Sequence, residues 1–436
     1  MRKRNRASPN FKGERSNTIK SDGAAIVKQM AESKNQYRKP DVLAYTLARL
    51  AAWPLAHFVF QRRVLRNEIR RKSGGFVVIA NHECALDFVN LIGLCPRRMT
   101  FVISRSFYST LPLQRIFDRI GVLPKQQFQT ELADLKRMKA VVSAGEPLVL
   151  YPAGLMCEDG RSTPIPQGTW SLFRLLNVDI YMARTTGAYH VMPKWSKHLR
   201  PGRTYMDVYR LFTREELHSL SKEEIRRRTE EALSFDAYAE QDRLRIPYHR
   251  GDNVEGLEQV VYQCPDCRRK YTIRAKGNTL HCDSCGFSAS ADSYGFLYSA
   301  SNIPRYISQW NRDILRSLEE DLPNRTSFSL PCTIHTIDKT HHRFRETGRG
   351  MAVLTPQELS LVGQNKGESL VICQSVISFP SLPFSPGHYF EIQNGREIYR
   401  CYPEEGKYVM EFINTLKLWH QHGQKATLRY KGENLP

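Results

Sequence analysis

Between residues 75 and 200, short apolar runs alternate with stretches of helical periodicity, and this alternation constrains the fold more than any other feature of the sequence. Four runs have the apolar, β-branched composition of strands: FVVIA, MTFVIS, PLVLYPAG and DIYMARTTG. The stretches with helical periodicity are DFVNLIGLC, LPLQRIFDRIG, TELADLKRMKAVVSAG and GTWSLFRLLN. This alternating order predicts an α/β domain with a largely parallel sheet, which we place at residues 73–245. In such sheets, reactive groups gather in the turns at the carboxyl ends of strands.

The turn after the first of these strands, NHECALD, carries a histidine and an aspartate five positions apart. One interpretation is that Asp87 caps the helix beginning DFVN, beside a hydrogen-bonded loop histidine. The other is that His82 is a general base whose tautomer Asp87 fixes, since an imidazole with a pKa of about 6.5 can take a proton from an alcohol at cellular pH. An ideal helix would put the two on different sides, but a strand-turn-helix connection can bring them together. Apart from Cys84, no serine or cysteine beside His82 is an obvious nucleophile. We therefore expect the substrate's own hydroxyl to be the attacking group.

Four cysteines form two C-x-x-C pairs in YQCPDCRRKYTIRAKGNTLHCDSCGF: Cys264, Cys267, Cys282 and Cys285. Each pair can give two thiolates to one ion, and a strand hairpin would bring the pairs together. Four thiolates favour a structural Zn²⁺ with no open position. We therefore predict a zinc ribbon at residues 258–292 that stabilises its own small fold. Disulfides or unliganded thiols are the alternative. We disfavour it because no apolar stretch closely follows the basic start MRKRNR, so a secretory signal is not expected.

The N-terminal region is basic, and its composition changes near residue 41. Residues 1–40 are polar and without periodicity, which is typical of a flexible tail. VLAYTLARLAAWPLAHFVF follows, close to the length of a membrane span. Arg49 in its middle would cost roughly 2.5–3.5 kcal/mol there, and a basic cluster, QRRVLRNEIRRK, comes next. We therefore predict that residues 41–72 lie in the interface of an anionic membrane, at its cytoplasmic face. A buried helix with a solvated basic neighbour is the alternative.

Residues 293–436 combine strand-like segments with a final helical stretch. The strand-like segments are MAVLT, ELSLVG, SLVICQ, HYFEIQ and EIYRCYP, and the helical stretch is KYVMEFINTLKLWHQH. Several short strands before one helix predict a small β-rich domain capped by that helix, in the manner of a pleckstrin-homology fold.

The block NHECALD resembles the N-H-x-x-x-x-D block of the glycerolipid acyltransferases, the lysophosphatidate (1-acylglycerol-3-phosphate) acyltransferase family. The likeness continues in order to about residue 195, through TFVISRSFYSTLPLQRIFDRIGVLPKQQ, LVLYPAGLMCEDGRS and NVDIYMARTTGAYHVMP. The ribbon is similar to an appendage of some bacterial members. The resemblance implies an acyl thioester donor, either coenzyme A or acyl carrier protein, and a lysophosphatidate-like acceptor in phospholipid biosynthesis. It also implies that His82 deprotonates the acceptor hydroxyl while Asp87 supports the imidazole.

Four further residues fall in the blocks with which the family binds its acceptor. In the match, Arg105 and Lys125 take the basic positions of the second block, and Gly154 and Arg161 lie in the block similar to F-P-E-G-x-R-S, which holds phosphate. Fixed cations suit a phosphate dianion, although each of the three cations could equally be an ordinary solvated charge. Ala153 stands at the family's glutamate, and the insert LMCEDG displaces the arginine. We therefore expect an altered acceptor site.

Two hypotheses of function follow. A membrane-surface O-acyltransferase acting on a lysophospholipid accounts for the His82 turn and for the apolar basic segment. A basic zinc-ribbon protein that binds nucleic acid or acts as a scaffold, with an inactive acyltransferase-like domain, accounts for the net charge of +20 and the cysteines. The second leaves the four ordered blocks to coincidence. We therefore predict the enzyme, with an anionic membrane surface and not nucleic acid as its partner.

Overall fold

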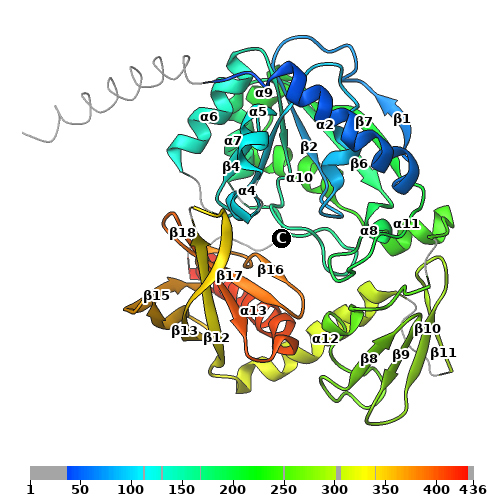
Figure 1. Cartoon of the computed structure of the whole chain (residues 1–436), viewed down its shortest axis with the longest axis vertical. Coiled ribbons are helices and arrows are strands. Elements are labelled where there is room, and N and C mark those ends of the chain that lie inside the picture. Colours follow the sequence, from blue (N-terminus) through cyan, green and yellow to red (C-terminus); the bar gives the residue numbers. More distant parts are fainter. Residues whose placement is uncertain are drawn as a thin grey trace, which may run out of the picture.

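The computed structural model describes residues 37–110, 113–128, 131–166, 168–248, 251–300, 306–338 and 340–430. Figure 1 shows an α/β domain at the top, a β-rich C-terminal domain at the lower left and a small four-stranded unit at the lower right. Helix α12 (Ile307–Asp321) lies between the two lower parts. Most of the predicted tail, its first 36 residues, lies outside the described part of the chain.

Seven strands form the sheet of the α/β domain, in the order β1-β7-β6-β2-β5-β3-β4. They are β1 (Arg63–Asn67), β2 (Phe76–Ala80), β3 (Thr100–Ser104), β4 (Leu123–Lys125), β5 (Pro147–Leu150), β6 (Ile180–Thr186) and β7 (Tyr205–Phe212). Neighbouring strands run parallel except β6 and β7. The predicted α/β domain with a largely parallel sheet is therefore confirmed.

Helices cover both faces of this sheet (Figure 1). They are α2 (Val42–Pro54), α3 (Asp87–Leu91), α4 (Arg105–Thr110), α5 (Gln114–Arg119), α6 (Leu132–Ser143), α7 (Thr169–Leu176), α8 (Ala188–Val191), α9 (Arg214–Ser219), α10 (Lys222–Leu233) and α11 (Ala237–Leu244). Alternate residues of the buried strand β2 point to opposite faces. Phe76 and Val78 pack into a core shared with α2 and α3, and Val77 and Ile79 into a core shared with α6, α7 and α10. Burial on both faces explains why this strand is continuously apolar in sequence.

The sheet begins earlier in the chain than the sequence analysis placed it. Strand β1, which lies within residues 41–72, pairs in parallel with β7. Four of its five residues are exposed, and Arg66 forms an ion pair with Asp207 at 2.8 Å. A short basic strand at the edge of a sheet has no alternating apolar pattern, so sequence periodicity could not detect it.

Helix α2 and the π-helical turn Leu55–Val59 that follows it pack on the α/β domain through one side. Tyr45, Ala52 and Ala56 are buried on that side. Arg49 also points inward, because its guanidinium donates to the carbonyl oxygens that follow α3, those of Ile92, Pro96 and Arg97, at 3.1, 3.1 and 2.8 Å. The guanidinium of Arg49, whose charge argued against a membrane span, is therefore hydrogen-bonded within the α/β domain.

The opposite side of this helix is apolar and exposed. Leu43, Leu47, Leu50, Trp53 and Phe58 are each more than half exposed. The segment Val42–Val59 is long and apolar enough to cross a membrane by length and composition, and 17% of it is buried. The helix therefore presents an apolar stripe to its surroundings, rather than a fully buried surface.

The four-stranded unit contains all four paired cysteines. Its strands are β8 (Ile273–Lys276), β9 (Thr279–Cys282), β10 (Ser288–Ala291) and β11 (Leu297–Ser299), and neighbours are antiparallel. Strand β11 carries this sheet past residue 292, because the Asp292 carboxylate accepts backbone N–H groups of Tyr294 and Phe296 and closes the intervening turn. Its buried residues belong to one core with those of α12 and the C-terminal domain, so the unit packs against both of them.

The C-terminal domain is a seven-stranded antiparallel sheet with a long final helix, as the sequence predicted. The strands are β12 (Phe328–Asp338), β13 (Arg343–Leu354), β14 (Glu358–Asn365), β15 (Glu368–Ser375), β16 (Phe384–Ser385), β17 (Tyr389–Asn394) and β18 (Glu397–Pro403), and the helix is α13 (Val409–Tyr430). The order is β15-β14-β13-β12-β18-β17-β16. Phe412 and Leu416 of α13 are buried in the core of this domain. Its likeness to a pleckstrin-homology fold stays a prediction.

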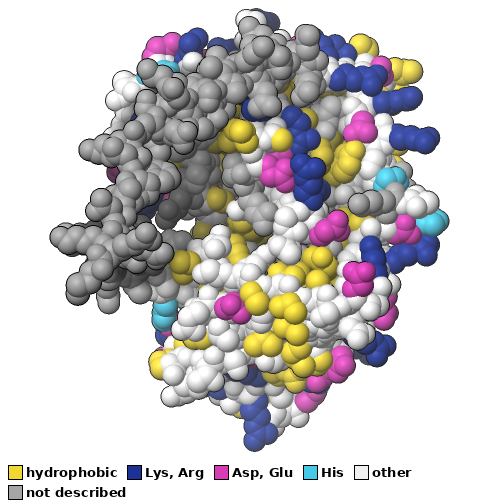
Figure 2. Space-filling model, turned by 90° about the vertical axis from the view of Figure 1, so that its left-hand side faces the viewer, with side chains coloured by type: hydrophobic (Ala, Val, Ile, Leu, Met, Phe, Trp, Pro, Cys, Tyr) yellow, Lys and Arg dark blue, Asp and Glu magenta, His cyan; other side chains and the backbone are white. Residues whose placement is uncertain are grey.

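One part of the C-terminal sheet leaves apolar side chains on the surface. Met351, Val362 and Val371 are exposed and occupy paired positions on β13, β14 and β15. Figure 2 shows hydrophobic side chains gathering in the lower half of this face, whereas Lys and Arg side chains are interspersed with Asp and Glu toward its right. The outer part of this sheet therefore has an apolar surface as well as an apolar core.

Candidate active site

His82 and Asp87 lie together in the turn that follows β2. Nδ1 of His82 is 2.9 Å from Oδ2 of Asp87, and the two side chains are 22% and 1% exposed. The same oxygen accepts the backbone N–H groups of Glu83 at 2.8 Å and of Cys84 at 3.1 Å. Helix α3 begins at Asp87 without a side-chain cap. The aspartate therefore caps the turn rather than the helix, and it holds the histidine at the same time.

This contact determines which nitrogen of His82 can act as a base. Because Asp87 accepts at Nδ1, the neutral ring carries its proton there and its lone pair on Nε2. Among the described residues, no group is hydrogen-bonded to Nε2, and the ring lies on that of Tyr151 with centroids 4.6 Å apart. His82 also lines a cavity. The pair therefore has the arrangement of a general base with its orienting carboxylate.

Two polar residues beside the pair hold the turn in place, and sequence reasoning missed both. The Asn81 side chain donates to the carbonyl of Thr185 and accepts its N–H, both at 2.8 Å, which extends the pairing of β2 with β6. Glu83 is fully buried and accepts from Asn81 at 3.0 Å and from the backbone N–H of Tyr189 at 2.9 Å. Burial, with the nearby Glu240 and Asp87 charges, raises the pKa of Glu83 well above its usual range. In the sequence, Asn81 and Glu83 were marked only as polar residues directly after a buried strand.

Cys84 is not placed to act as a nucleophile. Its thiol is fully buried and donates to Oδ1 of Asp87 at 3.3 Å. Burial raises the pKa of this thiol well above its usual range, whereas a reactive cysteine needs a lowered pKa and access to substrate. The attacking group must therefore come from elsewhere.

A cavity of about 1160 Å³ extends from His82 between the α/β domain and the C-terminal domain. Most of its wall is apolar. Phe101, Met138 and Leu172 contribute from the α/β domain, and Pro383 and Phe384 from the C-terminal domain. A large, mostly apolar cavity with a few polar groups suits a substrate with a long hydrocarbon part. The C-terminal domain is thus part of the wall beside His82.

Two of the four predicted acceptor-binding residues line this cavity with His82. The Nζ of Lys125 donates to the carbonyl of Gln126 at 2.9 Å, and burial lowers the pKa of this lysine. Gly154 has a φ of +70°, a conformation that favours glycine. Arg105 does not line the cavity, and its guanidinium lies 3.7 Å from the carboxylate of Glu131.

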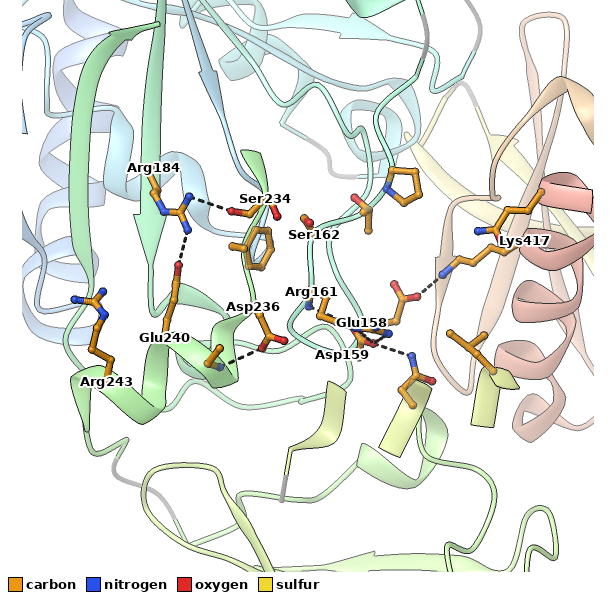
Figure 3. Close-up of a pocket in the computed structure, with 17 residues that line it drawn as sticks. Glu158, Asp159, Arg161, Ser162, Arg184, Ser234, Asp236, Glu240, Arg243 and Lys417 are labelled. Carbon is orange, nitrogen blue, oxygen red and sulfur yellow. Dashed lines mark hydrogen bonds and ion pairs between the residues drawn. The ribbon is translucent and has the colours of Figure 1, made fainter. Parts of the chain in front are cut away.

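Arg161 lies in a different pocket, of about 780 Å³, shown in Figure 3. Its Nε donates to Oδ2 of Asp159 at 2.9 Å and its backbone N–H to Oδ1 at 3.1 Å. Asp159 also accepts from Asn311 of α12 at 2.9 Å. The structure therefore separates Arg161 from the cavity of His82 and pairs it with an acid of the insert.

The insert LMCEDG, Leu155–Gly160, contacts both the turn of His82 and the parts of the chain that follow the α/β domain. The backbone N–H of Cys157 donates to the carbonyl of His82 at 3.4 Å. Glu158 accepts a hydrogen bond from Lys417 of α13 (Figure 3). A smaller pocket of about 340 Å³ also reaches His82 and is lined by Ala153. Ala153, which stands at the position of the family's glutamate, therefore lines a pocket together with His82 but offers no carboxylate.

The four paired cysteines form one cluster. Their sulfur atoms all lie within 4.8 Å of one another, and the Cys264–Cys285 and Cys267–Cys282 sulfurs are 3.7 and 3.8 Å apart. Four sulfurs about 2.3 Å from a central zinc in a tetrahedron would be about 3.8 Å apart, whereas a disulfide needs about 2.05 Å. The arrangement therefore fits a four-thiolate metal site and not a pair of disulfides.

Parts of this chain are similar to known proteins. Residues 59–193 match the family model named Acyltransferase, which confirms the resemblance of this segment to the glycerolipid acyltransferases. The 1-acyl-sn-glycerophosphate (LPA) acyltransferase PlsC from Thermotoga maritima is 16% identical, with a TM-score of 0.35, over 50% of this chain and 82% of its own. The Ran-binding domain of Nup2 from Ashbya gossypii is 12% identical, with a TM-score of 0.18, over 22% and 97%. No curated protein matches the chain.

Proposed function

We propose that this chain, which carries an acyltransferase-family domain, is an O-acyltransferase of phospholipid biosynthesis. It would move a fatty acyl group from an acyl thioester to the hydroxyl of a lysophospholipid such as 1-acylglycerol-3-phosphate. The observation that carries the proposal is the His82–Asp87 pair, which lies beside a large apolar cavity within the matched segment. The fold alone would not support an activity, because one fold can serve many functions.

The geometry supports the following reaction. Nε2 of His82 takes the proton of the acceptor hydroxyl while its oxygen attacks the thioester carbonyl. A C–O bond forms, the C–S bond breaks, and the proton passes from the imidazolium to the departing sulfur. Asp87, 2.9 Å from Nδ1, stabilises the imidazolium during transfer. A base placed in this way typically contributes about 10²- to 10⁴-fold to the rate.

The apolar cavity beside His82 accounts for the acyl chains of such a reaction. Donor and acceptor each carry a hydrocarbon part, and removing a chain from water is favourable by about 0.8 kcal/mol for each CH₂ group. The donor is coenzyme A or acyl carrier protein in this proposal, because the chemistry at His82 requires a thioester and not a particular carrier. Holding both substrates in one cavity also converts the transfer into an effectively unimolecular step.

We further propose that α2 places the enzyme on the cytoplasmic face of a membrane, as a peripheral or interfacially anchored protein. The exposed apolar stripe of Leu43, Leu47, Leu50, Trp53 and Phe58 supports this location. Each large apolar side chain that leaves water contributes about 1.5–3 kcal/mol. The inward direction of Arg49 removes the charge that would oppose shallow insertion. An anionic lipid surface also suits the net charge of +20.

We propose that the cysteine cluster holds a structural Zn²⁺. The separations of its sulfurs support four-thiolate coordination. Such an ion would stabilise the strand pair β8–β9 and, through their shared core, the packing of α12 on the C-terminal domain. With all four positions filled by protein ligands, the ion would have no place for substrate and no part in the chemistry at His82.

The deciding experiment is acyl transfer to lysophosphatidate by the purified full chain, from radiolabelled acyl-coenzyme A and acyl carrier protein. We expect His82→Ala to lower the rate by about 10²- to 10⁴-fold. His341→Ala is a matched control, because His341 also lies against an aspartate, Asp338, at 2.7 Å but on the exposed surface. Wild-type protein that transfers nothing to any lysolipid, or a His82→Ala variant as active as wild type, would contradict the proposal. DNA binding that salt abolishes, without transfer, would favour the nucleic-acid alternative.

A further inference from the structure

Two lysines and one glutamate lie near the border of the cavity of His82 with the C-terminal domain. Lys194 lines that cavity, whereas Lys417 and Glu158 line the neighbouring pocket of Arg161. Lys417 of α13 is bonded to Glu158 of the insert, and their side chains are 20% and 10% exposed. Lys194 follows α8 and lines the cavity. Its Nζ is buried and has no hydrogen-bond partner within the described residues. The group therefore has two lysine side chains and one carboxylate, and that carboxylate is bonded to Lys417.

The amino group of Lys194 lies over the ring of Phe384 and makes a cation–π contact with it. The Nζ of Lys194 lies 3.3 Å from the ring centroid, and the Nζ of Lys417 lies 5.6 Å from it. A desolvated cation on an aromatic face gains about 2 kcal/mol, whereas the effective penalty of burying an ion is several kcal/mol. The ring therefore offsets only part of the cost of burying this charge.

The surroundings of Lys194 disfavour its charged form. The pKa of Lys194 is lowered to about 7, chiefly by burial, while the charge of Glu158 raises it and the charge of Lys417 lowers it. Burial raises the pKa of Glu158, but the charges of Lys417 and Lys194 hold it below its usual range. An anion bound at Lys194 would supply both the acceptor and the negative charge that this site lacks.

Three other cations in or near the cavity already have hydrogen-bond partners. The Nζ of Lys125 donates to the carbonyl of Gln126 at 2.9 Å. Arg161 is held by Asp159 in another pocket. Arg400, on the cavity wall, donates to Glu391 at 2.8 and 3.0 Å. Lys194 differs from these three cations, because its Nζ is buried and has no hydrogen-bond partner among the described residues.

We propose that Lys194, set on Phe384 of the C-terminal domain, binds the phosphate monoester of the acceptor while the acyl chain occupies the same cavity. This assignment rests on the proposed function and deepens it, because it names the group that distinguishes a phosphate-bearing acceptor from a neutral one. It gives the C-terminal domain a part in substrate binding, since Phe384 and Lys417 both come from that domain. It also gives a role to the insert, which supplies Glu158.

The test is Lys194→Met, which keeps the length of the side chain and removes its charge. We expect KM for lysophosphatidate to rise by about 10- to 100-fold, the loss of a charge-assisted hydrogen bond, with kcat changed less than about twofold. KM for monoacylglycerol, which lacks the phosphate, should stay unchanged. Lys139→Met is the matched control, because Lys139 is also partly buried but donates to the carbonyl of Leu176, away from the cavity. Equal changes for both acceptors, or no change for either, would overturn the assignment.

A binding measurement separates this assignment from the catalytic proposal. Calorimetric titration of short-chain lysophosphatidate, monoacylglycerol and inorganic phosphate into His82→Ala, with and without Lys194→Met, needs no turnover. Lysophosphatidate binding that depends on Lys194 supports the assignment even if wild type transfers nothing. Inorganic phosphate that binds through Lys194 while lysophosphatidate does not would overturn it. Lys194→Gln, which keeps a polar donor, repeats the test should the methionine variant fail to fold.

Discussion

Replacing Asp87 by asparagine separates its two roles in the turn, because the variant can keep the shape of the site and lose only the charge. Oδ2 accepts from His82 and from the backbone N–H groups of Glu83 and Cys84, so the amide oxygen must occupy that position. The new NH₂ group then takes the place of Oδ1, 3.3 Å from the sulfur of Cys84, which can turn its proton away and accept. The turn should therefore form as in wild type.

We expect Asp87→Asn to destabilise the transition state of acyl transfer rather than the folded protein. A hydrogen bond to a charged group contributes about 1.5–3 kcal/mol and a neutral one about 0.5–1.5 kcal/mol. The imidazolium of His82 should therefore lose about 1–2 kcal/mol of stabilisation in Asp87→Asn, which is roughly a 5- to 30-fold lower kcat/KM. In Asp87→Ala, the N–H groups of Glu83 and Cys84 lose their acceptor, so the free energy of unfolding should also fall by about 2 kcal/mol or more.

The assay pairs steady-state acyl transfer with urea unfolding of the same preparations. Asp338→Asn is the control, since it changes the exposed pair with His341 in the same way. Two results would refute the reasoning. Asp87→Asn with wild-type kcat/KM would mean that the aspartate only caps the turn. Asp87→Asn as unstable as Asp87→Ala would mean that the amide cannot replace the carboxylate in this geometry.

Three further predictions concern the membrane, the metal and pH. The double substitution Leu47→Glu with Leu50→Glu should abolish co-sedimentation with anionic liposomes, because both side chains are exposed on the outer side of α2. Acyl transfer to a detergent-dispersed acceptor should stay unchanged. If the variant still sedimented with liposomes, this helix would be excluded as the anchor. Purified protein should contain about one zinc per chain, and Cys264→Ser or a strong chelator should lower Tm; a metal-free protein with an unchanged Tm would contradict the zinc site. Because burial lowers the pKa of Lys194 to about 7 from 10.5, the unfolded chain binds more protons between these values, and the free energy of unfolding should rise with pH across that window. Urea unfolding should show this rise in wild type relative to Lys194→Met, and parallel pH profiles would contradict it.

Local sequence patterns were sufficient to predict the elements around the candidate active site. A strand covered on both faces must be apolar at every position, as β2 is from Phe76 to Ala80. Two cysteines with two residues between them can reach one ion from a single turn, so their spacing predicted the cluster before any fold was known. His82 and Asp87 could likewise be paired, because only a short turn separates them.

Local sequence patterns could not predict contacts between distant parts of the chain. The edge strand β1 is exposed, so its sequence carried no apolar signal, and only its pairing with β7 identifies it. A match to a family block placed Arg105 and Arg161 in the right segments, but it could not show that Glu131 and Asp159 would take their charges. Ion pairing depends on what lies within a few ångströms in space.

The sequence by itself therefore determined the α/β class, the contact between His82 and Asp87 and the cysteine cluster, because each depends on residues close together in the chain. Only the tertiary structure decided which side chains line the cavity of His82. The cavity of His82 is closed by a second domain, and Lys194 reaches it over the ring of Phe384, which comes from that domain. The direction of a side chain and its burial are set by the packing of both domains, and the spacing of residues along the chain carries no record of that packing.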